Sequence, residues 1–241
     1  MKVYLSALET NPDVDKSFTR YDYMLFSFYY LRQSFFDQVK DKCDSILIDS
    51  GAHSFQRGGV KVKWDEYTHQ YAEWIKQNDR DNIIGYFEMD IDRVVGYDKV
   101  LQLRSVLERV SDKIIPVWHK NRGIADYKAM CEKYAGKWIA ITGFKNEDIK
   151  DEQYMMFLKY AKKFGCKVHC LGMTRTRILD KVPFDSVDSS SWKQSAIYGR
   201  VGDKKVKKEY SKTNRTDVMV SALHEAMKMQ KHYRKKWIAN E

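Results

Sequence analysis

The stretch Ile46-Leu-Ile-Asp-Ser-Gly-Ala-His-Ser-Phe-Gln56 decides how the rest of the chain is interpreted. Its first three residues are aliphatic, as in a strand that is covered on both faces, and Gly51 allows a sharp turn soon afterwards. Asp49 then stands at the carboxyl end of that strand. A carboxylate buried there without a partner would cost several kcal/mol or take up a proton. The stretch therefore predicts a buried strand that leads into a polar site.

Seven other short apolar runs have the same character, and each precedes a polar or helix-like segment. The eight runs are residues 3–6, 23–27, 45–49, 83–90, 113–119, 138–142, 167–172 and 186–189. Apolar residues recur at helical spacing over residues 64–77, 97–110, 124–134 and 151–164. Eight strand–helix units in 241 residues predict a single-domain (β/α)8 barrel of the TIM type. An open, doubly wound sheet is the alternative.

Polar residues cluster at the carboxyl ends of these strands, where a barrel of this kind places its active site. They are Asp49, His53, Glu88, Asp90, Asp92, Trp118, His119, Thr142, Gly143, His169, Gly172, Asp185 and Asp188. Their common placement predicts one polar pocket. Structural roles are the alternative: Asp185 and Asp188 are also suited to cap backbone N–H groups. Asp90 or Asp92 could pair with Arg93, which would leave only one of them to face the site.

The composition is that of a folded protein without export or membrane segments. Apolar residues make up 43% of the chain and aromatic residues 14%, with only three prolines. The start of the chain is too polar for a signal peptide, and no apolar run approaches the roughly 18 residues of a membrane span. Cys43, Cys131, Cys166 and Cys170 lack zinc-site spacing. We expect a cytoplasmic protein with reduced cysteines, no bound zinc and no cofactor.

Much of the net charge of +10 lies near the end of the chain. Residues 200–241 hold twelve Lys and Arg against five Asp and Glu, a balance of +7. Residues 199–215 are predicted to be an exposed basic loop, and residues 217–237 a helix that Thr216 and Asp217 cap. The loop predicts contacts with nucleic-acid phosphates through Lys204, Lys205, Lys207, Lys208, Lys212 and Arg215. A solvated face that only aids solubility is the alternative.

Two motifs resemble those of the tRNA-guanine transglycosylases. The segment 49–56 resembles their Asp-Ser-Gly-Gly-Phe-Gln signature, and Asp185-Ser-Val-Asp-Ser189 resembles their Asp-x-Phe-Asp-Ser/Cys segment. Weaker similarities lie at 86–90 and 141–144. The signature here has two extra residues, Trp118-His-Lys120 replaces Gln-Gly-Gly, and the Cys-rich zinc subdomain is missing. Together with Asp188-Ser-Ser-Ser-Trp192, this pattern looks more like the short phage-type enzymes that place 7-deazaguanine derivatives in DNA.

The resemblance implies a base exchange that proceeds through a covalent glycosyl intermediate. It implies that Asp188 is the nucleophile, Asp49 the general acid/base and Asp90 the residue that holds the purine edge. Asp185 is the alternative nucleophile if the register shifts by three residues. Further substrate contacts are expected at Ser50, Gly51, Phe55, Trp118, His119, Gly143 and Asp185. DNA in a phage-infected host cytoplasm is the implied acceptor, ahead of tRNA, and a homodimer or partner subunit stays open.

Two other classes of function stay open at this point. A metal-dependent barrel hydrolase would gather His53, His119 and His169 with Asp49 or Asp188 around a divalent cation. No His-x-His pair supports that set, and base exchange accounts better for the Asp-Ser-Gly motif. A barrel that only binds nucleic acid would keep the basic tail and make the acids dispensable.

Overall fold

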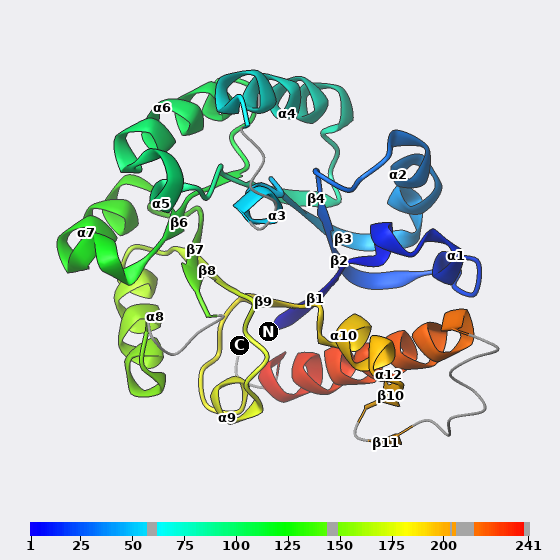
Figure 1. Ribbon diagram of the computed structural model, residues 1–241. Helices are drawn as coiled ribbons and strands as arrows, with labels where there is room; N and C mark the ends of the chain where they lie inside the picture. Colours follow the sequence, from blue (N-terminus) through cyan, green and yellow to red (C-terminus); the bar gives the residue numbers. More distant parts are fainter. Residues whose placement is uncertain (57–61, 144–148, 203, 206–214, 239–241) are drawn as a thin grey trace.

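The computed structural model describes residues 1–56, 62–143, 149–202, 204–205 and 215–238. In these residues nine parallel strands form one sheet that curls into a nearly closed barrel, with helices around it (Figure 1). The strands are β1 (Lys2–Ser6), β2 (Tyr21–Ser27), β3 (Cys43–Asp49), β4 (Ile83–Phe87), β5 (Ile114–Ile115), β6 (Val117–Trp118), β7 (Trp138–Thr142), β8 (Lys167–Leu171) and β9 (Ser186–Ser189). The prediction of a barrel is confirmed.

The barrel closes where Pro116 interrupts one predicted strand. The sheet order runs β5-β4-β3-β2-β1-β9-β8-β7-β6, so β5 and β6 are its two ends, although they are consecutive in the chain. Proline has no N–H to donate to a strand ladder. β5 therefore pairs with β4, while β6 pairs with β7 and the Pro116 carbonyl accepts a hydrogen bond from Ala140 N at 2.8 Å. The predicted strand 113–119 thus becomes the two pieces that join the ends of the sheet.

Glu88 supports this break from inside the protein. Its Oε1 accepts a hydrogen bond from Val117 N at 2.6 Å, the first N–H after the proline. Arg104 of α6 binds both carboxylate oxygens, at 2.5 and 3.1 Å, and donates to the Tyr134 hydroxyl at 3.3 Å. Glu88 and Arg104 are both buried. Glu88, a strand-end acid in the sequence, is therefore a structural residue that ties the helix layer to the closure.

Helices surround the strands and also cover their carboxyl ends. The α-helices are α1 (Pro12–Asp15), α2 (Gln33–Val39), α3 (Ala52–Gln56), α4 (Trp64–Asn78), α5 (Asp92–Val95), α6 (Tyr97–Glu108), α7 (Gly123–Lys133), α8 (Tyr154–Lys163), α9 (Thr176–Leu179), α10 (Ser191–Ile197) and α12 (Arg215–Ile238), and the 3₁₀ turns are η1 (Leu8–Thr10), η2 (Lys40–Lys42), η3 (Lys120–Arg122) and η4 (Asp151–Gln153). The four predicted amphipathic segments correspond to α4, α6, α7 and α8. Short α3, α5 and α10 follow directly after β3, β4 and β9, so they lie at the carboxyl ends of these strands.

The core has two parts because alternate strand residues face opposite sides of the barrel wall. The larger cluster packs the strands against the helices. The smaller cluster contains Tyr4, Tyr23, Leu25, Leu47, Phe87, Ile115, Val117 and Ala140, whose alternate positions place them inside the barrel. All four cysteines are buried and carry free thiols, as expected. In the described part of the chain, no helix is both long and apolar enough to cross a bilayer.

The C-terminal region differs from the prediction in two respects. α12 begins at Arg215, so Thr216 and Asp217 lie in its first turn and do not cap it. Part of the predicted basic loop forms a short antiparallel hairpin of β10 (Arg200–Val201) and β11 (Lys204–Lys205). Gly202, with φ 57°, supplies the left-handed residue that such a tight turn favours. α12 packs against β1, where Gln230 donates hydrogen bonds to two strand carbonyls, each at 2.7 Å.

Candidate active site

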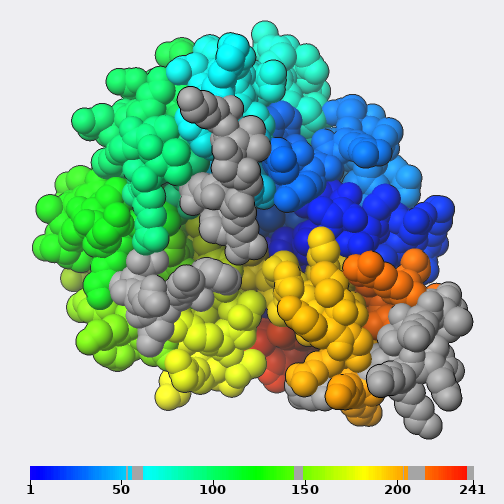
Figure 2. Space-filling model, in the orientation of Figure 1, coloured from blue at the N-terminus to red at the C-terminus, as the bar shows by residue number. Residues whose placement is uncertain are grey.

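A cavity of about 1420 Å³ opens at the carboxyl ends of the strands. Its polar lining includes Glu9, Ser27, Asp49, Asp90, Asp92, His119, Thr142, Asp188 and Lys193. Figure 2 shows this face of the molecule, on which α10 and the segments that follow β1 and β2 lie side by side. Typical small-molecule pockets measure roughly 300–1,000 Å³. The cavity therefore has room for more than one purine base.

Asp49 projects into this cavity from the end of β3. Its Oδ2 accepts a hydrogen bond from Gly51 N at 3.0 Å. The turn requires glycine, because Gly51 has φ 76° and an added Cβ would lie 2.4 Å from the Cβ of Tyr29. Burial raises the pKa of Asp49 to about 7, and the nearby charges of Asp188 and Asp90 add to the effect. A carboxyl group that exchanges its proton near neutral pH is suited to general acid/base chemistry.

Asp188 lies on β9 and is held by two donors. Its Oδ1 accepts hydrogen bonds from Gly172 N at 2.6 Å and from the buried His169 ring, whose Nε2 is at 3.2 Å. The other nitrogen of that ring, Nδ1, lies 2.8 Å from Ser186 Oγ. The His169 tautomer with its proton on Nε2 satisfies Asp188. The arrangement fixes the direction of the Asp188 carboxylate at the cavity wall.

Asp185 lies at the opposite end of the barrel, so its predicted role in substrate binding is wrong. It precedes β9, and its carboxylate binds Lys162 Nζ at 2.6 and 2.7 Å and Val168 N at 2.7 Å. Parallel strands bring their carboxyl ends to one face, and Asp185 stands at the amino end of its strand. Of the two candidate nucleophiles, therefore, Asp188 lines the described cavity and Asp185 does not.

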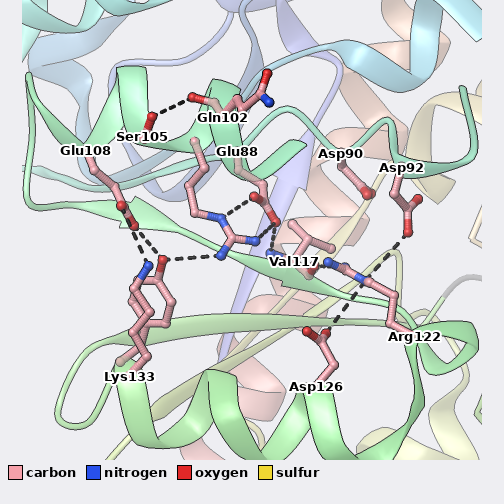
Figure 3. Close-up of polar contacts among 12 residues, drawn as sticks. Glu88, Asp90, Asp92, Gln102, Ser105, Glu108, Val117, Arg122, Asp126 and Lys133 are labelled. Atoms are coloured by element: carbon pink, nitrogen blue, oxygen red, sulfur yellow. Dashed lines mark hydrogen bonds and ion pairs between the residues drawn. The ribbon is translucent and has the colours of Figure 1, made fainter. Parts of the chain in front are cut away.

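Asp90 and His119 form a close pair on another part of the wall. Asp90 Oδ1 lies 2.5 Å from His119 Nε2. Burial lowers the pKa of His119, but the hydrogen bond and charge of Asp90 outweigh it and the net pKa is raised. Asp92, at the start of α5, also lines the cavity, with Arg122 Nε at 3.5 Å (Figure 3). Both acids of this run therefore face the site.

Asp90, Asp92 and His119 could together hold a metal ion. Among the described residues they form a group whose ligand atoms all lie within 4.8 Å of one another. Two carboxylates and an imidazole suit several divalent cations. The predicted metal site instead combined three histidines with Asp49 or Asp188. One of those histidines, His169, is hydrogen-bonded to Asp188 inside the barrel. The side chain of His53 lies outside the described part of the structure.

Trp118 is a core residue, so its predicted contact with substrate is wrong. It is 1% exposed, and its ring centroid lies 4.9 Å from that of Tyr127 and 5.0 Å from that of Phe157, in α7 and α8. Neighbouring strand residues point to opposite sides, and Val117 belongs to the cluster inside the barrel. Trp118 must then point outward, toward the helices.

Three other residues that were predicted to contact the substrate pack beside the site without lining the described cavity. Phe55 packs in an aromatic cluster, with ring centroids 4.3 Å from Tyr29 and 4.9 Å from Tyr67. Ser50 is buried, and its carbonyl accepts the Tyr67 hydroxyl at 2.6 Å. At Gly143 an added Cβ would lie 2.6 Å from Cys170 Sγ, so the residue lets β7 approach β8 closely. None of the three is among the residues that line the described cavity.

Glu9 is a cavity residue that sequence reasoning missed. It lies on η1, after Ala7 turns the chain with a left-handed φ of 76°. Its Oε1 accepts a hydrogen bond from Ser27 N at 3.1 Å, while Oε2 is buried and has no hydrogen-bond partner among the described residues. Burial raises the pKa of Glu9 to about 7, an effect that nearby Lys193 opposes. The strand-end rule would have found Glu9 if it had been extended three residues past β1.

The predicted phosphate-binding residues are only partly described. Lys204, Lys205 and Arg215 are exposed. Lys207, Lys208 and Lys212 lie outside the described residues. Comparison of the chain with protein-family models, with curated proteins and with solved structures gave no match. The geometry of the cavity is therefore the basis for assigning a function.

Proposed function

We propose that the protein is a base-exchange transglycosylase that replaces guanine in nucleic acid with a 7-deazaguanine derivative. One observation carries this proposal: Asp49 and Asp188 line the same cavity in unlike environments. Burial raises the pKa of Asp49 to about 7, so a large fraction of it is protonated at neutral pH. Asp188 instead accepts two N–H donors. A general acid paired with an oriented carboxylate is what a glycosyl-transfer site needs.

The exchange takes two displacements at the sugar carbon C1′. In the first, an Asp188 oxygen bonds to C1′ as the C1′–N9 bond breaks, and the departing guanine takes the proton of Asp49. In the second, N9 of the incoming base bonds to C1′, its N–H proton passes to Asp49, and the bond to Asp188 breaks. Protons and charges balance over the cycle. Both acids return to their starting states.

The Asp90–His119 pair is suited to hold the purine. A guanine Watson–Crick edge offers N–H donors beside the O6 acceptor. Asp90 is an acceptor for the N–H groups, and His119 Nε2, 2.5 Å from Asp90 Oδ1, holds this carboxylate in position. This assignment agrees with the role that the family resemblance implies for Asp90.

The acceptor that we propose is DNA, which follows from the resemblance to the short phage-type enzymes. A base within a duplex does not reach the end of a barrel, so it must be unpaired or flipped out. Lys204, Lys205 and Arg215 are exposed cations suited to the phosphates. tRNA is the alternative acceptor. Action on phage DNA in a host cytoplasm is part of the same proposal.

The test is transfer of label from a radiolabelled 7-deazaguanine base to DNA or to tRNA, assayed separately. We expect label in DNA with the wild-type protein, none with Asp188→Ala, and near-normal uptake with the control Asp185→Ala at the other end of the barrel. Label in tRNA alone would show that tRNA, and not DNA, is the acceptor. Absence of label from both polymers would refute base exchange.

Metal-dependent hydrolysis is the second candidate, favoured by the Asp90–Asp92–His119 group. Isothermal titration with Zn²⁺ and Mn²⁺, with His119→Ala as the comparison, tests it directly. Stoichiometric binding that His119→Ala abolishes, together with metal-dependent phosphoester cleavage, would favour the hydrolase. Base exchange that persists in the presence of a chelator would exclude it.

A further inference from the structure

Two adjacent tyrosines, Tyr29 and Tyr30, are partly exposed beside the cavity. Tyr29 is 44% and Tyr30 47% exposed, and their ring centroids lie 4.7 Å apart in an edge-to-face arrangement. Tyr30 also lines the cavity. Single exposed apolar residues are ordinary on protein surfaces. A pair of touching rings, one of which lines the cavity, calls for a more specific explanation.

The backbone holds this pair rigidly. Phe28 N donates to the Asp49 carbonyl at 2.8 Å, and the N–H groups of Tyr30 and Leu31 both donate to the Ser27 carbonyl at 3.0 Å. Phe28 packs into the aromatic layer, with its ring centroid 4.9 Å from that of Tyr71, and Leu31 is buried. The two anchored residues flank the exposed pair. The backbone that carries the two tyrosine rings is therefore fixed beside the cavity.

A cation lies two residues further along the chain. Arg32 is exposed, lines the cavity, and makes no side-chain hydrogen bond or ion pair with the rest of the described chain. Lys193 lines the cavity from the α10 side, near Arg215. The inner wall, by contrast, carries the carboxyl groups. A nucleic-acid strand has the complementary distribution, since its phosphates suit a basic rim and its guanine N–H groups suit an acidic interior.

We propose that Tyr29, Tyr30 and Arg32 form a stacking site for unpaired nucleotides that flank the nucleotide in the cavity. Bases stack on aromatic rings whatever their sequence, and a neighbouring arginine neutralises the backbone. The protein therefore binds single strands in preference to duplexes. The identity of the nucleotide in the cavity rests on the proposed function, whereas the stacking does not.

The test is the binding of a fluorescently labelled oligo(dT), which contains no guanine and so cannot be a substrate for exchange. We expect tighter binding of this single strand than of a dA·dT hairpin duplex. Tyr30→Ala should weaken single-strand binding about 5- to 150-fold, the range expected when one base no longer stacks on an aromatic ring. Tyr30→Phe keeps the ring and should bind like wild type. Met156→Ala, which removes an exposed apolar side chain on α8, is the control.

Salt dependence separates the two kinds of contact. Tyr30→Ala should lower the affinity without changing the slope of log K against log salt, while Arg32→Ala should reduce that slope by about 0.7 for a single strand. Equal affinity of Tyr30→Ala and wild type would overturn the proposal. So would a dimer in sedimentation that Tyr29→Ser and Tyr30→Ser dissociate, because the surface would then belong to a second copy. Tyrosine-dependent binding without any base exchange would refute the proposed function alone.

Discussion

Replacing Asp49 with asparagine removes a carboxyl group that burial makes costly to ionise. The folded-state pKa is about 7, against an ordinary value of 3.8. Because the folded state binds the proton more tightly, the stability that this group confers is complete below about pH 4 and is lost as pH rises to about 7. Three units of pKa at 1.36 kcal/mol each give a loss of at most about 4 kcal/mol. Solvent in the cavity reduces this figure.

Asparagine keeps an oxygen to accept the Gly51 N–H and does not titrate. The free energy of unfolding of Asp49→Asn should therefore rise relative to that of the wild type as pH increases, by at most about 2.6 kcal/mol between about pH 5 and about pH 8. Urea denaturation of both proteins across this range measures the difference in free energy of unfolding. Ser54→Ala, a non-titrating change in the same cavity, should show a difference that does not vary with pH. A pH-independent difference for Asp49→Asn would refute the argument from burial.

Three further predictions concern the buried Glu88–Arg104 pair, the choice between Asp185 and Asp188 as nucleophile, and the basic hairpin of β10 and β11. Arg104→Met leaves Glu88 buried without its partner, and urea denaturation should show a loss of about 3–5 kcal/mol. Asp185→Asn should leave the rate of label uptake into DNA unchanged, because this residue lies at the end of the barrel away from the cavity; a loss of exchange would return the nucleophile to that position. Replacing Lys204 and Lys205 with alanine should reduce the salt slope of duplex binding by about 0.9 for each phosphate that is no longer neutralised, and an unchanged slope would make the hairpin a solubilising surface.

Sequence periodicity predicted the barrel and part of the site for one physical reason. Parallel strands place their carboxyl ends on one face, so a polar residue at the end of an apolar run falls in the cavity. Asp49, Asp90 and Asp188 follow this rule. Asp185 does not reach the cavity because it precedes β9, and the four residues of that strand separate it from the carboxyl end. The short apolar run alone did not show which end of the strand faces the cavity.

The errors at Trp118 and Glu9 come from structural details that the pattern of apolar residues does not contain. Pro116 splits its strand, and the alternation of side chains then directs Trp118 outward while Val117 faces inward. Glu9 was missed because a left-handed Ala7 carries the chain back over the barrel beyond the end of β1. A strained turn of this kind depends on tertiary packing. Sequence alone predicts the face of the barrel, whereas packing selects which side chains reach the cavity.

The central claim is that Asp188 forms a covalent bond to the sugar. Denaturing electrophoresis of the protein after incubation with labelled DNA and a slowly released base analogue tests this claim most directly. We expect a labelled protein–DNA adduct with wild type and none with Asp188→Ala. Asp49→Ala should still form the adduct, but roughly 10²–10⁴-fold more slowly, because the departing guanine then lacks its proton donor. An adduct that survives Asp188→Ala would contradict the claim.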